Sequence, residues 1–235
     1  MTNWFDTPLG RRVLQEETIV AREAMEDVFG FDLLQVGPWG PGRGLLQAAR
    51  TQHTTLVGEH AARGVTLQAQ LAALPLAADC VDAVLLPHTL ELVDDPYAVL
   101  REAERILRIL RPEGSLLICC FNPYSGWGLR RILARRFDRP VFPPGIQRMI
   151  SELRLKDWMA FLGIDVEQVW GYLGLLPWAG AGGEAVYRSR PAMMGGAYLL
   201  KARKRTQTLT LLRPKWKPRP RVLVGAPEPT SQVRG

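Results

Sequence analysis

Short, nearly continuous apolar runs recur along the chain, and stretches with helical periodicity separate them. The runs that predict strands cover residues 31–37, 53–59, 65–71, 80–88 and 115–121. Continuous apolar runs, as opposed to alternating ones, indicate strands covered on both faces, as in a parallel sheet between helices. Two later runs, 165–173 and 195–205, predict two more strands. We expect this last pair to be antiparallel, because a loop and no helix joins them.

Apolar positions at helical spacing predict the helices. Residues 8–29 carry a stripe that runs from Val13 to Val28, with Glu17 at one of its positions. The clearest helix follows the fourth strand: Asp94 or Asp95 caps it, Pro96 occupies its first turn and Pro112 follows it. A basic helix over 128–137 and an amphipathic helix over 150–163 come after the fifth strand. The whole pattern predicts an α/β domain.

Composition narrows the class of protein. The 235 residues are 47% apolar and 23% charged, which excludes a disordered chain and a disulfide scaffold. There are three cysteines without a CxxC pair and three histidines, so we expect a reducing compartment and no metal site. The N-terminus lacks the pattern of a signal peptide, and no apolar run approaches about 18 residues. A cytoplasmic protein without a transmembrane segment is therefore predicted.

Positive charge is concentrated near the C-terminus. Residues 188–235 hold twelve Lys or Arg and one acid, a net charge of +11, whereas the whole chain carries +7. The last part is also rich in proline, which is typical of an extended tail. Such a tail could contact nucleic acid or an anionic membrane, although a solubilising role is the commoner meaning of a charge run.

The order of several motifs points to a family. Leu74–Pro75 precedes VDAVLLPHTLELVDDP (81–96), VLREAERIL (99–107) and LRPEGSLLI (110–118). This series closely resembles the class I S-adenosylmethionine-dependent methyltransferases of the type 11 family, and in particular a poorly characterised proteobacterial subgroup. The resemblance implies a Rossmann-like, doubly wound, mostly parallel seven-stranded sheet with one antiparallel strand. The predicted domain spans 30–205, between an N-terminal helical segment (1–29) and a basic, Pro-rich tail (206–235).

The resemblance also implies a site for S-adenosylmethionine in the loops that follow the strands. A carboxylate only accepts hydrogen bonds, so Glu59 suits two ribose hydroxyls, and Gln70 is placed near the adenine. The first loop departs from the family pattern, in which an acidic residue precedes G-x-G-x-G, because Gln35 and Trp39 stand there instead. The predicted cofactor residues are Gly37, Pro38, Trp39, Gly40, Glu59, Gln70, Leu71, Leu86 and His88.

Candidates for the chemistry itself are few. His88, at the end of the fourth strand, is the candidate catalytic base, with a structural histidine as the alternative. Asn122 and Tyr124 are expected to face the substrate pocket. Trp170 and Tyr172 are expected to line it too, within an uncharged segment that could form an apolar lid, and core packing is their alternative.

Three functions remain open at this level. The first is methyl transfer by in-line displacement to a small acceptor that the sequence does not identify. The second is a non-catalytic binding or regulatory protein with the same fold, which the departures at Gln35, Trp39 and Gln70 favour. The third is methylation of RNA or of a ribosomal protein, which the basic C-terminal region and the arginines of 130–139 favour.

Overall fold

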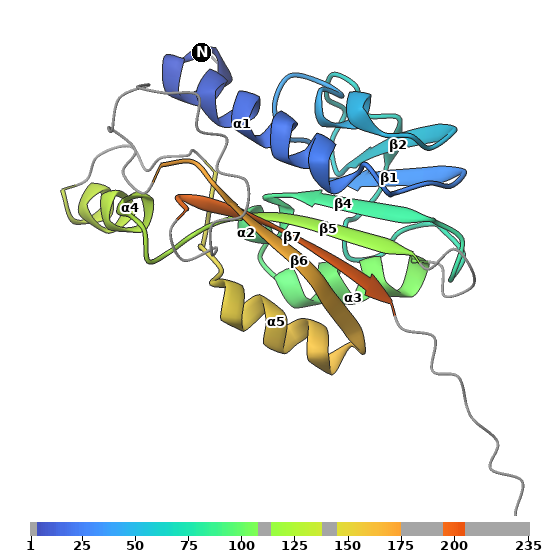
Figure 1. Cartoon of the computed structure of the whole chain (residues 1–235). Helices are drawn as coiled ribbons and strands as arrows, with labels where there is room; N and C mark the ends of the chain where they lie inside the picture. The colour runs from blue at the N-terminus through green and yellow to red at the C-terminus, as the bar shows by residue number, and fades with distance from the viewer. Residues whose placement is uncertain (1–3, 108–113, 138–144, 175–194, 205–235) are drawn as a thin grey trace, which may run out of the picture.

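The structure is a computed structural model that describes residues 4–107, 114–137, 145–174 and 195–204. Its centre is a seven-stranded sheet with the strand order β3-β2-β1-β4-β5-β7-β6 (Figure 1). All neighbours pair in parallel except β7, which is antiparallel to both β5 and β6. The doubly wound sheet with one reversed strand that the sequence predicted is confirmed, as is the antiparallel pairing of the last two strands.

The strands follow the predicted apolar runs closely. Their bounds are β1 Asp32–Val36, β2 His53–Gly58, β3 Leu67–Gln68, β4 Ala83–Pro87, β5 Ser115–Phe121, β6 Ile164–Tyr172 and β7 Ala197–Lys204. Every residue of β4 and β5 is buried, because helices cover both faces of the sheet centre. The predicted third strand, 65–71, shrinks to two residues at the sheet edge, where a single neighbour, β2, supports it.

Capping residues set where the helices begin. Thr7, Asp95, Ser125 and Ser151 each accept a backbone N–H in the first turn of the helix that follows. The first predicted helix ends at Ala24, five residues before its predicted end at residue 29. The helices are η1 Trp4–Asp6, α1 Pro8–Ala24, η2 Leu45–Ala48, α2 Thr89–Leu92, α3 Pro96–Ile106, α4 Gly126–Arg136 and α5 Glu152–Phe161. None of these helices combines the length and apolarity that crossing a membrane requires.

Helices form a layer on each face of the sheet. Figure 1 shows α1 on one face and α3 and α5 on the other, with α4 standing at one end. Two apolar clusters result, one between the sheet and α1 and one between the sheet and α3 with α5. Cys119 and Cys120 belong to opposite clusters, as neighbours in a strand must. The predicted basic tail, 206–235, lies outside the described residues.

Candidate active site

The crevice where such sheets bind ligands lies beyond the carboxyl ends of β1 and β4. From β1 the chain runs outward through β2 and β3, and it then crosses back to β4 on the other side of β1. Ligands of doubly wound sheets bind at this switch in strand order. The loop that begins at Gly37 follows β1, and His88 follows β4. This crevice is therefore where the predicted cofactor residues should meet.

A fully buried ionic cluster occupies the crevice. The Nε2 atom of His88 lies 2.7 Å from Oε1 of Glu17, and its Nδ1 atom lies 2.6 Å from Oε2 of Glu91. The Tyr172 hydroxyl lies 3.3 Å from both Glu17 Oε1 and His88 Nε2. The backbone N–H of Phe121 donates to Glu91. Residues of α1, α2 and β6 thus converge on one imidazole, and those of α1 and β6 come from distant parts of the sequence.

Two aromatic rings pack against the imidazole of His88. The indole of Trp39 lies 4.4 Å from the His88 ring, centroid to centroid, and the Phe121 ring lies 4.2 Å away. The Trp39 Nε1–H donates to Glu17 Oε2 at 2.6 Å. Trp39 therefore fills the space beyond β1 and is itself almost entirely buried.

The two carboxylates keep His88 charged. Burial alone would lower the pKa of His88, but the charges and hydrogen bonds of Glu17 and Glu91 outweigh burial and raise this pKa to about 9. At neutral pH both ring nitrogens therefore carry protons and donate. Burial raises the pKa of Glu91, although its hydrogen bond to His88 opposes that effect. A general base needs a free nitrogen lone pair, so this arrangement does not support the predicted role of His88 as catalytic base.

The backbone around His88 is held in an unusual conformation next to the end of β1. His88 has a φ of 56°, in the left-handed region that costs a non-glycine residue about 1 kcal/mol. The next residue, Thr89, donates its hydroxyl to the carbonyl of Val36, which ties the start of α2 to the end of β1. A Cβ on Gly37 would lie 2.7 Å from the Thr89 hydroxyl oxygen. The sequence predicted that Gly37 admits a ligand, but in this conformation it admits Thr89.

Several residues on the β2 side of the crevice are exposed to solvent, in contrast to the buried His88 cluster. Glu59, directly after β2, is exposed, and its Oε1 lies 3.5 Å from the N–H of Leu71. Gln70 is exposed beside it, and Pro38 is exposed in the first loop. Leu71 and Leu86 are buried. An acceptor-only carboxylate next to an amide side chain and a backbone N–H remains accessible here.

The predicted substrate residues lie on two faces of the sheet. Asn122 and Tyr124 line a pocket of about 620 Å³, together with Lys156 of α5 and Tyr198 of β7. Trp170 and Tyr172 instead belong to the apolar cluster under α1, where the Trp170 Nε1–H lies 3.3 Å from Glu23. The structure therefore does not gather these four residues into one pocket. Of the uncharged segment 168–183, which was predicted as a lid, residues 175–183 lie outside the described residues.

The charge of His88 makes stability depend on pH. We expect the free energy of unfolding to fall by roughly 1–2 kcal/mol between pH 6.5 and 8, because the unfolded chain releases the His88 proton in this window while the folded chain keeps it. The stabilisation is complete below pH 6.5 and is lost as the pH rises through about 9. Urea titrations at several pH values measure it. In His88→Asn the slope should vanish, and an unchanged slope would contradict a charged His88.

Sequence reasoning identified His88 but not its two partners. Glu17 lies on the inward stripe of α1, between Val13 and Val20. A carboxylate at an apolar position is a usable signal, since such a group is almost never buried unless it is paired. Glu91 lies only three positions after His88, and the structure buries it completely. Nothing in the sequence shows that Glu17, 71 positions away, meets His88.

Comparison with known proteins identifies the family of this chain. Residues 43–118 match the type 11 family of methyltransferase domains. An uncharacterised protein of Escherichia coli K12, YafS, is 34% identical over 231 residues, which cover 95% of this chain and 90% of that protein. The chain belongs to the type 11 class I S-adenosylmethionine-dependent methyltransferases. This type 11 methyltransferase thus shares nearly its whole length with the bacterial relative.

Crystal structures of other methyltransferases share the fold. An S-adenosylmethionine-dependent methyltransferase of Thermotoga maritima superposes with a TM-score of 0.65 at 24% identity, over 86% of this chain and 93% of that one. The geranyl diphosphate C-methyltransferase of Streptomyces coelicolor, in complex with S-adenosylhomocysteine, gives 0.54 at 15% identity, over 83% and 82%. At these identities the likeness extends to the architecture of the type 11 methyltransferase and not to its substrate.

The residues of this type 11 methyltransferase fit the family's cofactor on one side only. Glu59 and Gln70 are accessible, as a nucleoside requires, and the buried Oε1 of Gln35 has no hydrogen-bond partner among the described residues, so it could accept from a ligand's amino group. Beyond β1 and β4, however, Trp39 and the His88 cluster fill the crevice. In this conformation the site is accessible to the nucleoside half of the cofactor. The other half of the cofactor would lie in the crevice, which is filled.

Proposed function

We propose that this protein is an S-adenosylmethionine-dependent methyltransferase that acts on a small acceptor. The observation that carries the proposal is the accessible Glu59 at the end of β2, with Gln70 and the Leu71 N–H beside it, on a fold whose family uses this cofactor. Family membership supports methyl transfer in general, and the size of the acceptor is our inference from the sequence.

Two residues of the chain would bind the nucleoside part of the cofactor. Glu59 would accept from two hydroxyls of a ribose, and Gln70 would accept from an adenine amino group. The cofactor, when bound, supplies a methyl group that its sulfonium already activates. The protein then needs to align and desolvate the reactants, which requires no general base unless the acceptor is protonated. This agrees with a His88 that has no free nitrogen.

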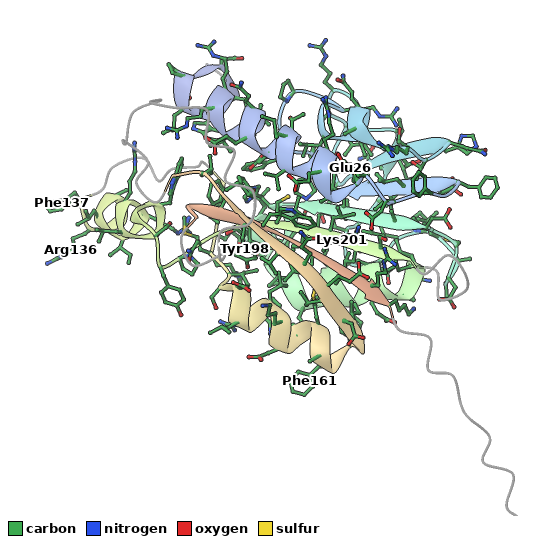
Figure 2. The ribbon with its side chains drawn as sticks, viewed as in Figure 1. Glu26, Arg136, Phe137, Phe161, Tyr198 and Lys201 are labelled. Carbon is green, nitrogen blue, oxygen red and sulfur yellow. The ribbon has the colours of Figure 1, made fainter. Side chains whose placement is uncertain are left out.

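Titration calorimetry with S-adenosylmethionine and S-adenosylhomocysteine tests the proposal. Glu59→Ala is expected to weaken binding of both compounds about ten- to a hundredfold, because the substitution removes the charged acceptor of two hydrogen bonds from the ribose. Glu26→Ala, which removes an exposed carboxylate near the end of α1, serves as the matched control (Figure 2). Equal affinities for the two variants would contradict a ribose site at Glu59.

The filled crevice favours one other function, a nucleoside-binding protein that does not catalyse methyl transfer. Trp39 and His88 leave the β2 side open while they close the space between β1 and β4. The same titration separates the two functions if adenosine is included. Binding of adenosine with an affinity equal to that of S-adenosylmethionine would favour the non-catalytic function. Tighter binding of the full cofactor would favour the enzyme.

A further inference from the structure

Helix α4 presents an apolar face to solvent. Leu129 is 52% exposed, Ile132 is 64% exposed and Leu133 is 46% exposed, at spacings that place them on one side of the helix. Phe137, directly after the helix, is 67% exposed, and Tyr124, just before it, is 80% exposed. Large apolar groups exposed singly are common, but a row of them along one helix marks an interaction surface.

The opposite face holds α4 on the body of the protein. Trp127 packs on Phe121 and donates its Nε1–H to the carbonyl of Gly174 at 3.0 Å. Arg131 donates to the carbonyl of Gln147, and Ala134 is buried. The three inward residues, Trp127, Arg131 and Ala134, recur at helical spacing. The orientation of α4 is thus fixed, and the apolar row faces outward as a consequence.

Positive charge accompanies the apolar row. Arg130 and Arg136 are exposed, and the helix contains no acidic residue. Figure 2 shows Arg136 and Phe137 together at the outer end of α4, pointing away from the sheet. A helix with aliphatic residues outward, arginines beside them and aromatic residues at its ends has the chemistry of an interfacial helix on anionic lipid.

We propose that the outward face of α4, formed by Leu129, Ile132, Leu133 and Phe137 with Arg130 and Arg136, docks on an anionic membrane surface. The aliphatic side chains would enter the boundary between headgroups and acyl chains, and each arginine would remain with the phosphates. Docking would be peripheral and reversible, because a single helix face buries little apolar area.

Two other occupants fit the same face less well. Affinity for nucleic acid comes mainly from cations that contact phosphates, and burying three aliphatic side chains would add little to it. A second copy of the chain would bring the arginines of two α4 helices together, and juxtaposed like charges oppose association. Lipid is the occupant that takes up both the apolar row and the positive charge.

Vesicle co-sedimentation of the full-length protein tests the proposal. We expect binding to vesicles of phosphatidylcholine mixed with phosphatidylglycerol, weaker binding as salt rises, and little binding to phosphatidylcholine alone. Ile132→Glu should weaken binding about tenfold or more, because a charge replaces a group that enters the lipid. The matched control is Phe161→Glu on α5, where the native side chain is 83% exposed but lies far from α4 (Figure 2).

A second variant and two further measurements make the result decisive. The double variant Arg130→Ala/Arg136→Ala should also weaken binding, and circular dichroism should show that all variants are folded. Binding that Ile132→Glu leaves unchanged would assign lipid contact to the basic C-terminal region and overturn the proposal. No vesicle binding, together with a dimer in sedimentation velocity that Ile132→Glu dissociates, would overturn it in favour of self-association. No vesicle binding, with retention on RNA, would overturn it in favour of nucleic acid.

Discussion

His88→Asn is expected to lower the free energy of unfolding by about 3–5 kcal/mol, the usual cost of removing one partner from a buried charge pair. The substitution would leave the carboxylates of Glu17 and Glu91 buried without the imidazolium that both contact. Asparagine is the appropriate replacement, because it tolerates the left-handed backbone of residue 88 better than most residues. Urea unfolding followed by tryptophan fluorescence and circular dichroism measures the loss.

Controls separate the ionic cluster from the loss of a side chain in general. His53→Asn, at an exposed position of β2, should change stability by less than about 0.5 kcal/mol. Glu17→Gln keeps the shape of Glu17 and should cost less in the His88→Asn background than in the wild-type protein, since the two residues contact each other. Additive losses, or equal losses for the two histidine variants, would mean that the cluster does not stabilise the fold.

Trp39→Ala is expected to raise the affinity for S-adenosylmethionine about tenfold or more while it lowers the free energy of unfolding by about 3–5 kcal/mol. The indole fills the crevice beyond β1 and also lines a pocket of about 430 Å³ between α1 and the first loop. Without the indole, this pocket would connect to the crevice. Binding would then no longer require the ring to move, so the affinity should rise although stability falls. Titration calorimetry and urea unfolding of the same preparation measure both effects.

Two variants test whether the space at Trp39 is responsible. Trp39→Leu removes the N–H group that donates to Glu17 but retains apolar bulk. The affinity of this variant for S-adenosylmethionine should therefore stay near that of the wild-type protein. Trp158→Ala removes an indole from α5, in the cluster on the other face of the sheet, and should not tighten binding. A loss of affinity in Trp39→Ala would show that the indole contacts the cofactor and does not exclude it.

Local patterns predicted the α/β class and most of the strands, whereas the topology of the sheet was implied by the family resemblance. The continuous apolar runs of β4 and β5 indicated a sheet covered on both faces, and β5 has the predicted bounds, Ser115–Phe121. The start of α3 was also predicted from neighbouring residues, with Pro96 in its first turn and Asp94 or Asp95 as its cap, and the structure shows that Asp95 is the cap. These features depend on interactions within a few positions of the chain, so a single sequence carries them.

Boundaries that depend on distant contacts were predicted less well. Helix α1 ends at Ala24 and not at residue 29, and β3 keeps two of seven predicted residues. For β3, which pairs only with β2, the local pattern did not set the length. An edge strand has one neighbouring strand, so its length depends on how many residues pair with that neighbour.

The sequence by itself determined the family, the order of the elements and the position of His88 at the end of a central strand. Only the tertiary structure decided what His88 does there. It brought Glu17 from α1 and Tyr172 from β6 to the same ring, placed Glu91 on its other nitrogen, and filled the crevice with Trp39. The physical reason is that charge state and access depend on burial and on partners distant in sequence, which residue types and spacing do not encode.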